Sequence, residues 1–230
     1  MFTNLSVIIP YHSVSPERDR IFEWILDRYK MLVPEAEICV GENNETPFNR
    51  GAARNDAYKK ATRDYFLVAD ADTAIETAAL GCGLLRLRQD APWVVPYGNY
   101  YNISQEISEQ ILRGSPEQKI IIHEGQWEHK VDSTAGMLLM PRMAWESVGG
   151  YDERFIGWGY EDNAFTCALN TLWGPHERVQ WGQGLHLWHP ILKGENFDSP
   201  MIEHNRALYR RYKKAQGNPA RMQALVKETS

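Results

Sequence analysis

The first 72 residues alternate between short apolar runs and helix-forming segments, and this alternation limits the chain to few folds. The runs LSVIIP, AEICVGE and DYFLVADAD are typical of buried strands. Between them, residues 15–32 carry apolar side chains at helical spacing, and PFNRGAARNDAYKKA has a small-residue face at Ala53, Ala57 and Ala61. Two consecutive strand–helix–strand units place parallel strands in one sheet with helices on its faces. The pattern therefore predicts an α/β fold.

Helix-start signals stand directly before the first amphipathic segment. Ser15 can cap the helix, Pro16 suits its first turn, and Glu17 favours the positive end of the helix dipole. Further helices are expected in ETAALGCGLLRLRQ, PRMAWESVGG, EDNAFTCALNTLWG and the polar segment from Pro200. Extended segments are expected in PWVVPYG, KIIIH and AGMLLM, with polar loop around KIIIH, and HLWHP is expected on an extended segment or a turn. No internal repeat or low-complexity linker divides the chain, which favours a single domain.

Charge and cysteine content exclude several classes of protein. A net charge of -5 and a pI near 5.8 argue against general nucleic-acid binding. The three cysteines are widely spaced without a C-x-x-C pair, which fits a reducing compartment and no structural zinc. The start of the sequence lacks the features of a signal peptide, and no run approaches the ~20 apolar residues of a membrane span. We therefore expect a cytoplasmic protein without a transmembrane segment.

Two carboxylates follow the third expected strand. Asp70 and Asp72 stand at positions i and i+2, so an extended backbone directs both side chains to one side. Ligands of open parallel sheets bind beyond the carboxyl ends of the strands, which is where these residues lie. A divalent cation relieves the repulsion of the two acids, and oxygen ligands suit Mg²⁺ or Mn²⁺, which in turn hold phosphate oxygens. A D-x-D pair in a loop can also occur by chance.

Residues suited to a nucleotide end the first strand and begin the second helix. Tyr11 can stack on a base, and Phe48 and Arg50 precede free backbone N–H groups that can meet a phosphate. Core packing is the ordinary alternative for Phe48, and solvation is the ordinary alternative for the arginines. Arg54, on the same helix, is expected at the surface.

Histidines and a second acidic pair occur late in the chain. In HLWHP, His189 is the better metal-ligand candidate and His186 the second, because both reach one ion only if the strand turns. Glu161 and Asp162 follow a Gly-Trp-Gly stretch at a loop-to-helix junction. A surface pair that serves solubility is the common alternative to a reaction centre at this position.

Several motifs, taken in order, resemble those of GT-A glycosyltransferases. These are VIIPYH, FNRGAARNDAYKKA, YFLVADADTAI, AGMLLMPRMAWESVGGYDERFIGWGYEDNAF and HLWHP, which span residues 6 to 190. The chain is most similar to the β-1,4-galactosyltransferase group and to the galactosyltransferase-like domain of polypeptide GalNAc-transferases and chondroitin synthases. The stretch GGYDERFIGWGYED is the specific part of this likeness. The resemblance implies a Rossmann-like GT-A domain with a mixed, mostly parallel sheet.

The resemblance also implies a role for each matching residue. Donor binding falls to Pro10, Tyr11, Phe48, Arg50, Asp70, Asp72, Gly136 and Trp158, with Trp158 on a mobile loop hinged at its flanking glycines. The metal ligands would be Asp72, His189 and His186. Glu161 would hold donor-sugar hydroxyls and Asp162 would act as the catalytic base. Tyr160 replaces a small residue of the family pattern, so the donor sugar stays open.

These assignments predict a metal-dependent hexosyltransferase that inverts the anomeric centre and uses a nucleotide-sugar donor, with UDP-sugar favoured and Mn²⁺ or Mg²⁺ as cofactor. The acceptor can be a glycan, a protein or a small molecule. The expected organisation is a catalytic domain over residues 1–199, with a nucleotide-binding half at 1–75 and an acceptor half at 76–199, followed by a helical tail at 200–230. A missing membrane anchor favours a bacterial or phage enzyme.

Three alternatives belong to other classes. A nucleotidyltransferase shares a similar sheet but needs a glycine-rich loop after the first strand, and PYHSVSPERDR contains no glycine. A glycosidase also uses two carboxylates, yet adjacent residues on one element seldom flank a bond. The third alternative is a silent module that binds a sugar nucleotide or a glycan. The basic residues of the tail belong to a solvated helix or to a surface for an acidic acceptor.

Overall fold

The computed structural model describes residues 1–131, 134, 136–190 and 200–229. Within them, the central sheet has six strands in the order β2-β1-β3-β8-β5-β9. β1 is parallel to both β2 and β3, and β5 is parallel to β9, whereas β8 is antiparallel to β3 and β5. The strands are β1 (Leu5–Pro10), β2 (Glu37–Gly41), β3 (Tyr65–Ala69), β5 (Val94–Val95), β8 (Met137–Pro141) and β9 (Glu177–Arg178).

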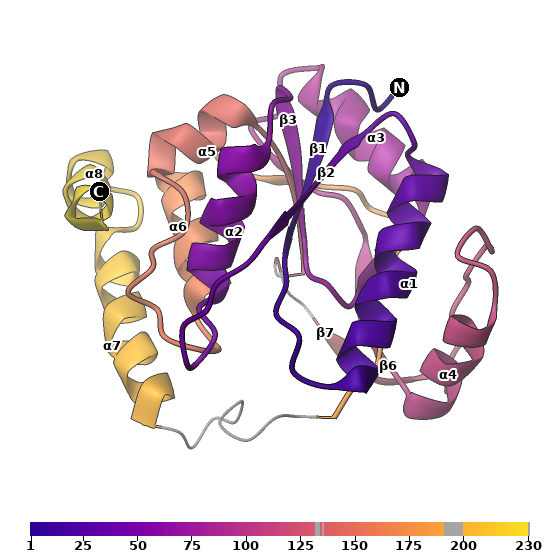
Figure 1. Cartoon of the computed structure of the whole chain (residues 1–230). Coiled ribbons are helices and arrows are strands. Elements are labelled where there is room, and N and C mark those ends of the chain that lie inside the picture. Colours follow the sequence, from indigo (N-terminus) through magenta and orange to yellow (C-terminus); the bar gives the residue numbers. More distant parts are fainter. Residues whose placement is uncertain (132–133, 135, 191–199, 230) are drawn as a thin grey trace.

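Helices cover both faces of this sheet, as the strand–helix alternation predicts. α1 (Pro16–Leu32) and α3 (Thr77–Leu87) lie on one face (Figure 1). The opposite face carries α2 (Arg50–Lys60), α5 (Arg142–Val148) and α6 (Glu161–Leu172). The expected α/β fold, with a mixed and mostly parallel sheet flanked by helices, is confirmed.

Local chemistry explains how the first two helices form and pack. The Ser15 side chain accepts a hydrogen bond from the Arg18 backbone N–H, and Pro16 occupies the first turn of α1, as expected. The small face of α2 allows a very close approach to β2. A Cβ atom on Gly41 would lie 1.8 Å from the carbonyl oxygen of Ala53, so a glycine is required there.

A second, smaller sheet crosses the carboxyl ends of the central strands. Its order is β4-β10-β6-β7, and its strands are β4 (Thr73–Ile75), β6 (Asn99–Ile103), β7 (Trp127–Val131) and β10 (Gln183–His186). β4 follows β3 after a short turn and pairs antiparallel with β10, with Thr73 opposite His186. The pairing therefore joins the end of the third strand to the histidines late in the chain.

The region between β6 and β7 differs from the expectation. KIIIH is not a strand, although Ile120 and Ile122 are buried. The Gln183 side chain accepts a hydrogen bond from the Ile122 backbone N–H and donates one to its carbonyl oxygen, so a side chain replaces a strand partner. α4 (Gln105–Arg113), capped by Ser104, lies in the stretch that the sequence assigned to polar loop.

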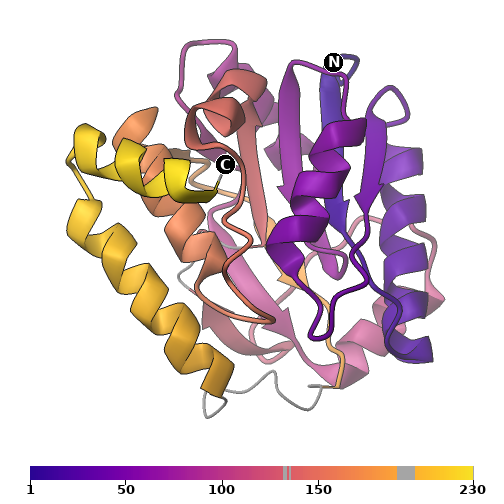
Figure 2. The same cartoon turned by 60° about the vertical axis from the view of Figure 1, so that its left-hand side comes forward.

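The C-terminal segment is helical, as expected, and packs against α6. α7 (Pro200–Ala215) and α8 (Pro219–Val226) lie outside α6 on the side away from the sheet (Figure 2). A short 3-10 turn, η1 (Lys227–Thr229), follows α8. α7 buries Leu208 and Tyr212, and α8 buries Met222. Among the described helices, none combines the length and the apolar character needed to cross a membrane.

Candidate active site

The residues that follow β3 lie at the sheet edge where the carboxyl ends of β1, β2 and β3 meet. The Asp70 backbone N–H donates to the carbonyl oxygen of Gly136, just before β8. Gly136 has a φ of +88°, and a Cβ atom there would lie 2.6 Å from the Tyr100 hydroxyl. The glycine therefore satisfies both a left-handed backbone and close packing against Tyr100.

Asp72, His186 and His189 form a group that we call the Asp-His-His cluster. Asp72 Oδ2 lies 3.1 Å from His189 Nε2 and 3.6 Å from His186 Nε2. β10 ends at His186, and the Leu187 backbone N–H still donates to the Asp72 carbonyl oxygen. The chain then leaves the strand, which is the turn that both histidines need to reach one point.

The ligand atoms of this cluster all lie within 4.8 Å of one another. Burial alone would raise the pKa of the Asp72 carboxyl, but His186 and His189 outweigh it and hold that pKa well below its usual range. Asp72 in turn raises the pKa of His186 against the effect of burial. One carboxylate oxygen and two imidazole nitrogens that converge in this way fit a divalent cation.

A second cluster forms around a buried arginine, and here one expectation is wrong. Arg54 is not at the surface: its side chain is 1% exposed. Nη2 lies 2.6 Å from Asp70 Oδ1, and Nη1 lies 3.3 Å from Asp162 Oδ1 and 3.6 Å from Glu161 Oε1. The guanidinium also lies over the ring of Tyr151, 4.6 Å from its centroid. We call Arg54, Asp70, Glu161 and Asp162 the Arg54 cluster.

Asp162 is the more open of the two acids at the start of α6. Its side chain is 17% exposed, against 4% for Glu161. The Tyr151 hydroxyl donates to Asp162 Oδ1 at 3.0 Å, so both contacts described for this carboxylate involve the same oxygen atom. Burial raises the pKa of Asp162 to about 7, with Arg54 opposing the shift and Glu161 and Asp70 adding to it.

Glu161 is held more tightly by the chain. Its Oε2 accepts a hydrogen bond from the Gly159 backbone N–H, and its Oε1 faces Arg54. Tyr160, which lies between Gly159 and Glu161 in the chain, has a φ of +71°, a left-handed conformation that is uncommon for a residue with a side chain. Its ring stacks on Tyr209 of α7, which draws the side chain away from the cluster.

The donor residues expected from the first two strands lie at the same sheet edge. Pro10 ends β1. The ring of the following residue, Tyr11, stacks on Phe22, and its hydroxyl donates a hydrogen bond to Asp19. One face of Tyr11 is therefore covered. Phe48 is half-buried and stacks on His12.

The remaining expected residues lie on either side of the clusters. Arg50, at the start of α2, acts electrostatically to lower the pKa of His186, which places it near the Asp-His-His cluster. Trp158 is half-buried and directly precedes the Gly159 that binds Glu161.

Two residues at this site, Arg54 and Tyr151, were not predicted from the sequence. Arg54 gave no local signal, because an arginine on a helix is ordinarily solvated and its partners here come from β3 and α6. Tyr151 gave no such signal, because a tyrosine after Gly-Gly is typical of core packing.

Comparisons with known proteins gave a family match. The family model described as Glycosyltransferase like family 2 matches residues 30–173. The catalytic domain of Drosophila beta1,4-galactosyltransferase 7, in complex with xylobiose, aligns with a TM-score of 0.53 and 13% identity over 88% of this chain and 79% of that one. A search of curated proteins found no match.

Two further solved structures align with lower scores. A mutant of the Drosophila enzyme, in complex with manganese, UDP-Gal and xylobiose, has a TM-score of 0.47 and 11% identity over 80% of this chain and 71% of that one. The mannosyltransferase PcManGT from Pyrobaculum calidifontis, in complex with GDP-Man and Mn²⁺, has a TM-score of 0.49 and 13% identity over 97% of this chain and 68% of that one. At these identities the likeness concerns the fold alone.

Proposed function

The chain belongs to glycosyltransferase-like family 2 and is a GT-A glycosyltransferase, and we propose that it transfers a sugar from a UDP-sugar to an acceptor hydroxyl with inversion. The observation that carries this proposal is the meeting of the two clusters at one sheet edge. Asp72 belongs to the Asp-His-His cluster, and Asp70, two residues earlier, is bound to the Arg54 that also contacts Asp162. A cation site and an available base are thus joined through a few contacts.

The Asp-His-His cluster would hold the metal ion. A divalent cation bound there would stabilise the charge that develops on the leaving diphosphate. Because two of the three ligands are imidazole nitrogens, we expect Mn²⁺ to bind more tightly than Mg²⁺, which prefers oxygen ligands. Arg50, near His186, adds positive charge on the side where the diphosphate would lie.

Asp162 is our choice for the general base. An attacking hydroxyl must lose a proton, and a base is most effective when its pKa lies near the working pH. Burial brings the pKa of Asp162 to about 7, and Tyr151 and Arg54 orient the carboxylate through one oxygen. Neither of these two contacts uses the other oxygen, Oδ2, which would accept the proton, and a single base on the face opposite the leaving group gives inversion.

The other residues would bind and orient the substrates. Glu161 would hold donor-sugar hydroxyls while it anchors the Gly159 backbone. Pro10, Tyr11 and Phe48 would contact the nucleobase, Asp70 the ribose or the metal, and Gly136 the sugar-phosphate. Trp158 would lie between the donor and the acceptor. The acceptor class is a glycan, a protein or a small molecule.

Thermal shift with a panel of nucleotide sugars, with and without Mn²⁺, tests the donor site. Donor at about 100 times its Kd should stabilise the folded protein by about 2.7 kcal/mol, and only when the metal is present. Stabilisation that is indifferent to the metal would contradict the assignment of Asp72. The donor that passes this test then enters a UDP-release assay with a mixture of acceptors, and NMR of the product reads the anomeric configuration.

The same assay separates the rival functions. A silent binding module would give the metal-dependent shift without UDP release. A nucleotidyltransferase would also release no UDP from the nucleotide sugar, but it would release pyrophosphate when given a nucleoside triphosphate and a sugar phosphate. Retention of the anomeric configuration would overturn the role of Asp162 while leaving the metal site in place.

A further inference from the structure

The loop that connects α5 to α6, residues 149–160, is held along its length by α7. Asn205 of α7 is fully buried and makes the central contacts. Its Oδ1 accepts a hydrogen bond from the Ile156 backbone N–H, and its Nδ2 donates to the carbonyl oxygens of Ile156 and Trp158. One amide side chain thus satisfies three backbone groups next to Trp158.

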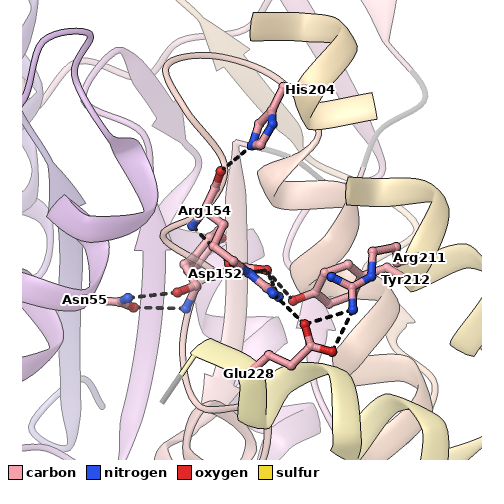
Figure 3. Close-up of polar contacts among 8 residues, drawn as sticks. Asn55, Asp152, Arg154, His204, Arg211, Tyr212 and Glu228 are labelled. Atoms are coloured by element: carbon pink, nitrogen blue, oxygen red, sulfur yellow. Dashed lines mark hydrogen bonds and ion pairs between the residues drawn. The ribbon is translucent and has the colours of Figure 1, made fainter. Parts of the chain in front are cut away.

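An ionic network fixes the first part of the same loop (Figure 3). Arg154 lies between Asp152 and Glu228, and Glu228 is also bound by Arg211 of α7. The Tyr212 hydroxyl donates to Asp152, which is only 7% exposed. Partnered in this way, the buried carboxylate ties the loop to α7 and to the turn after α8.

Further contacts along the loop complete the attachment. His204 Nε2 lies 3.1 Å from the Arg154 carbonyl oxygen, and the Arg206 guanidinium donates to the Tyr160 hydroxyl. Asn55 of α2 hydrogen-bonds both backbone groups of Tyr151 from the opposite side (Figure 3). A Cβ atom on Gly159 would lie 2.9 Å from Ile202 Cδ1, so the loop backbone packs closely on α7 as well.

We propose that Asn205 is a positioning residue: through the backbone at Ile156 and Trp158, α7 sets the place of Trp158 and of the Glu161–Asp162 pair that follows it. This rests on the proposed function, because the effect on transfer acts through those residues. A hinge movement at the glycines flanking Trp158 would then have to break the Asn205 contacts. On this proposal α7 is a part of the catalytic apparatus rather than an appended helix.

The alternative is a purely structural role, in which α7 only stabilises the fold. The two roles differ in what a substitution changes, since a misplaced reacting group lowers kcat while lost packing lowers the melting temperature. Leu208→Ala is the matched control, because Leu208 is a buried residue of the same helix whose apolar side chain makes none of the polar loop contacts.

The experiment compares Asn205→Ala with Leu208→Ala. We expect both variants to lower Tm, but only Asn205→Ala should lower kcat, by about tenfold to a hundredfold, with the KM for the donor nearly unchanged. Hydrogen exchange gives a direct readout: the Ile156 amide should lose protection in Asn205→Ala and keep it in Leu208→Ala.

A second variant guards against misfolding of Asn205→Ala. His204→Ala combined with Arg206→Ala removes two contacts at the surface side of α7, so the fold should persist, and kcat should fall about twofold to tenfold. Equal losses of kcat in Asn205→Ala and Leu208→Ala would overturn the proposal, as would a normal kcat in both Asn205→Ala and the double variant. A wild-type protein that releases no UDP with any donor would instead overturn the proposed function on which this inference rests.

Discussion

The Asp-His-His cluster and the Arg54 cluster both contain carboxylates, but these carboxylates obtain positive charge in different ways. In the Arg54 cluster a buried guanidinium touches three carboxylates, so the cation is part of the chain. In the Asp-His-His cluster the partners of Asp72 are two imidazoles, which carry full charge only when protonated. A metal ion can therefore take the place of those protons at one cluster, whereas Arg54 already fills the corresponding place at the other.

This difference assigns separate tasks to acids that the sequence alone treats alike. A carboxylate bound to a permanent cation stays in place without a ligand, and its pKa can be set by burial against that cation. A carboxylate beside two imidazoles is suited to bind an added cation, because imidazoles ligate a metal ion once they have given up their extra proton. Neutralising Asp162 and neutralising Asp72 are therefore expected to have different effects on transfer and on donor binding.

Neutralising Asp162 should give the largest effect on transfer. Asp162→Asn keeps the shape of the side chain but cannot accept a proton, so kcat should fall about 10²- to 10⁴-fold. Donor binding in the presence of Mn²⁺ should remain nearly intact, because the Asp-His-His cluster is unchanged. UDP release and donor-induced thermal shift, measured on the same preparation, check the two halves of this prediction; full turnover would exclude Asp162 as the base.

Removing the built-in cation should destabilise the protein more than any other change in these clusters. Arg54→Met leaves three carboxylates without their partner, and breaking a buried ion pair in this way costs about 3–5 kcal/mol of the free energy of unfolding. The loss should be larger at pH 8 than at pH 6, because protonation of the orphaned carboxylates at lower pH relieves it. Urea unfolding at both pH values measures this, and Arg54→Lys, which keeps the charge, should recover part of the stability.

Neutralising Asp72 should impair donor binding and turnover together. Asp72→Asn removes the carboxylate from the Asp-His-His cluster and should weaken Mn²⁺ binding by about 10- to 100-fold or more. Titration of Mn²⁺ against UDP release reads the metal affinity, and excess Mn²⁺ should restore part of the rate. Asp162→Asn serves as the control here and is read through the donor-induced thermal shift, whose dependence on Mn²⁺ should match the wild type. Equal metal dependence in Asp72→Asn would place the cation elsewhere.

The sequence predicted the main sheet well because the information is local. Apolar runs, the Ser15 cap and the small face of α2 each act within a few residues, and the structure reproduces them. The error at KIIIH has a different cause: the partner that replaces a neighbouring strand there is the side chain of Gln183, about sixty residues away. No local pattern reports such a contact.

The candidate site shows the same contrast between residues with a local sequence signal and residues placed by distant contacts. Asp70, Asp72, Glu161 and Asp162 stand out because each pair follows a local signal, a buried strand in one case and a Gly-Trp-Gly stretch in the other. Arg54 does not stand out, because its burial depends on carboxylates supplied by β3 and α6. A charged residue is buried only where partners from distant segments converge, and sequence spacing does not show that convergence.

The smallest effect, a shift of the pH profile, is the finest test of how Arg54 and burial share control of Asp162. The base works only when ionised, and burial raises the pKa of Asp162 to about 7. At saturating Mn²⁺ and donor, kcat should therefore be flat above pH 7 and fall about tenfold per pH unit below it. The Tyr151 hydroxyl bonds the ionised form and lowers that pKa, so Tyr151→Phe should move the acid limb of the profile to higher pH while the rate at high pH is nearly kept.

Tyr58→Phe, which alters a tyrosine bonded to Glu146 and not to either cluster, is the control and should leave the profile in place. An acid limb with its midpoint near pH 4 would mean that Arg54 outweighs burial, and the distinction drawn between the two clusters would then rest on the metal alone.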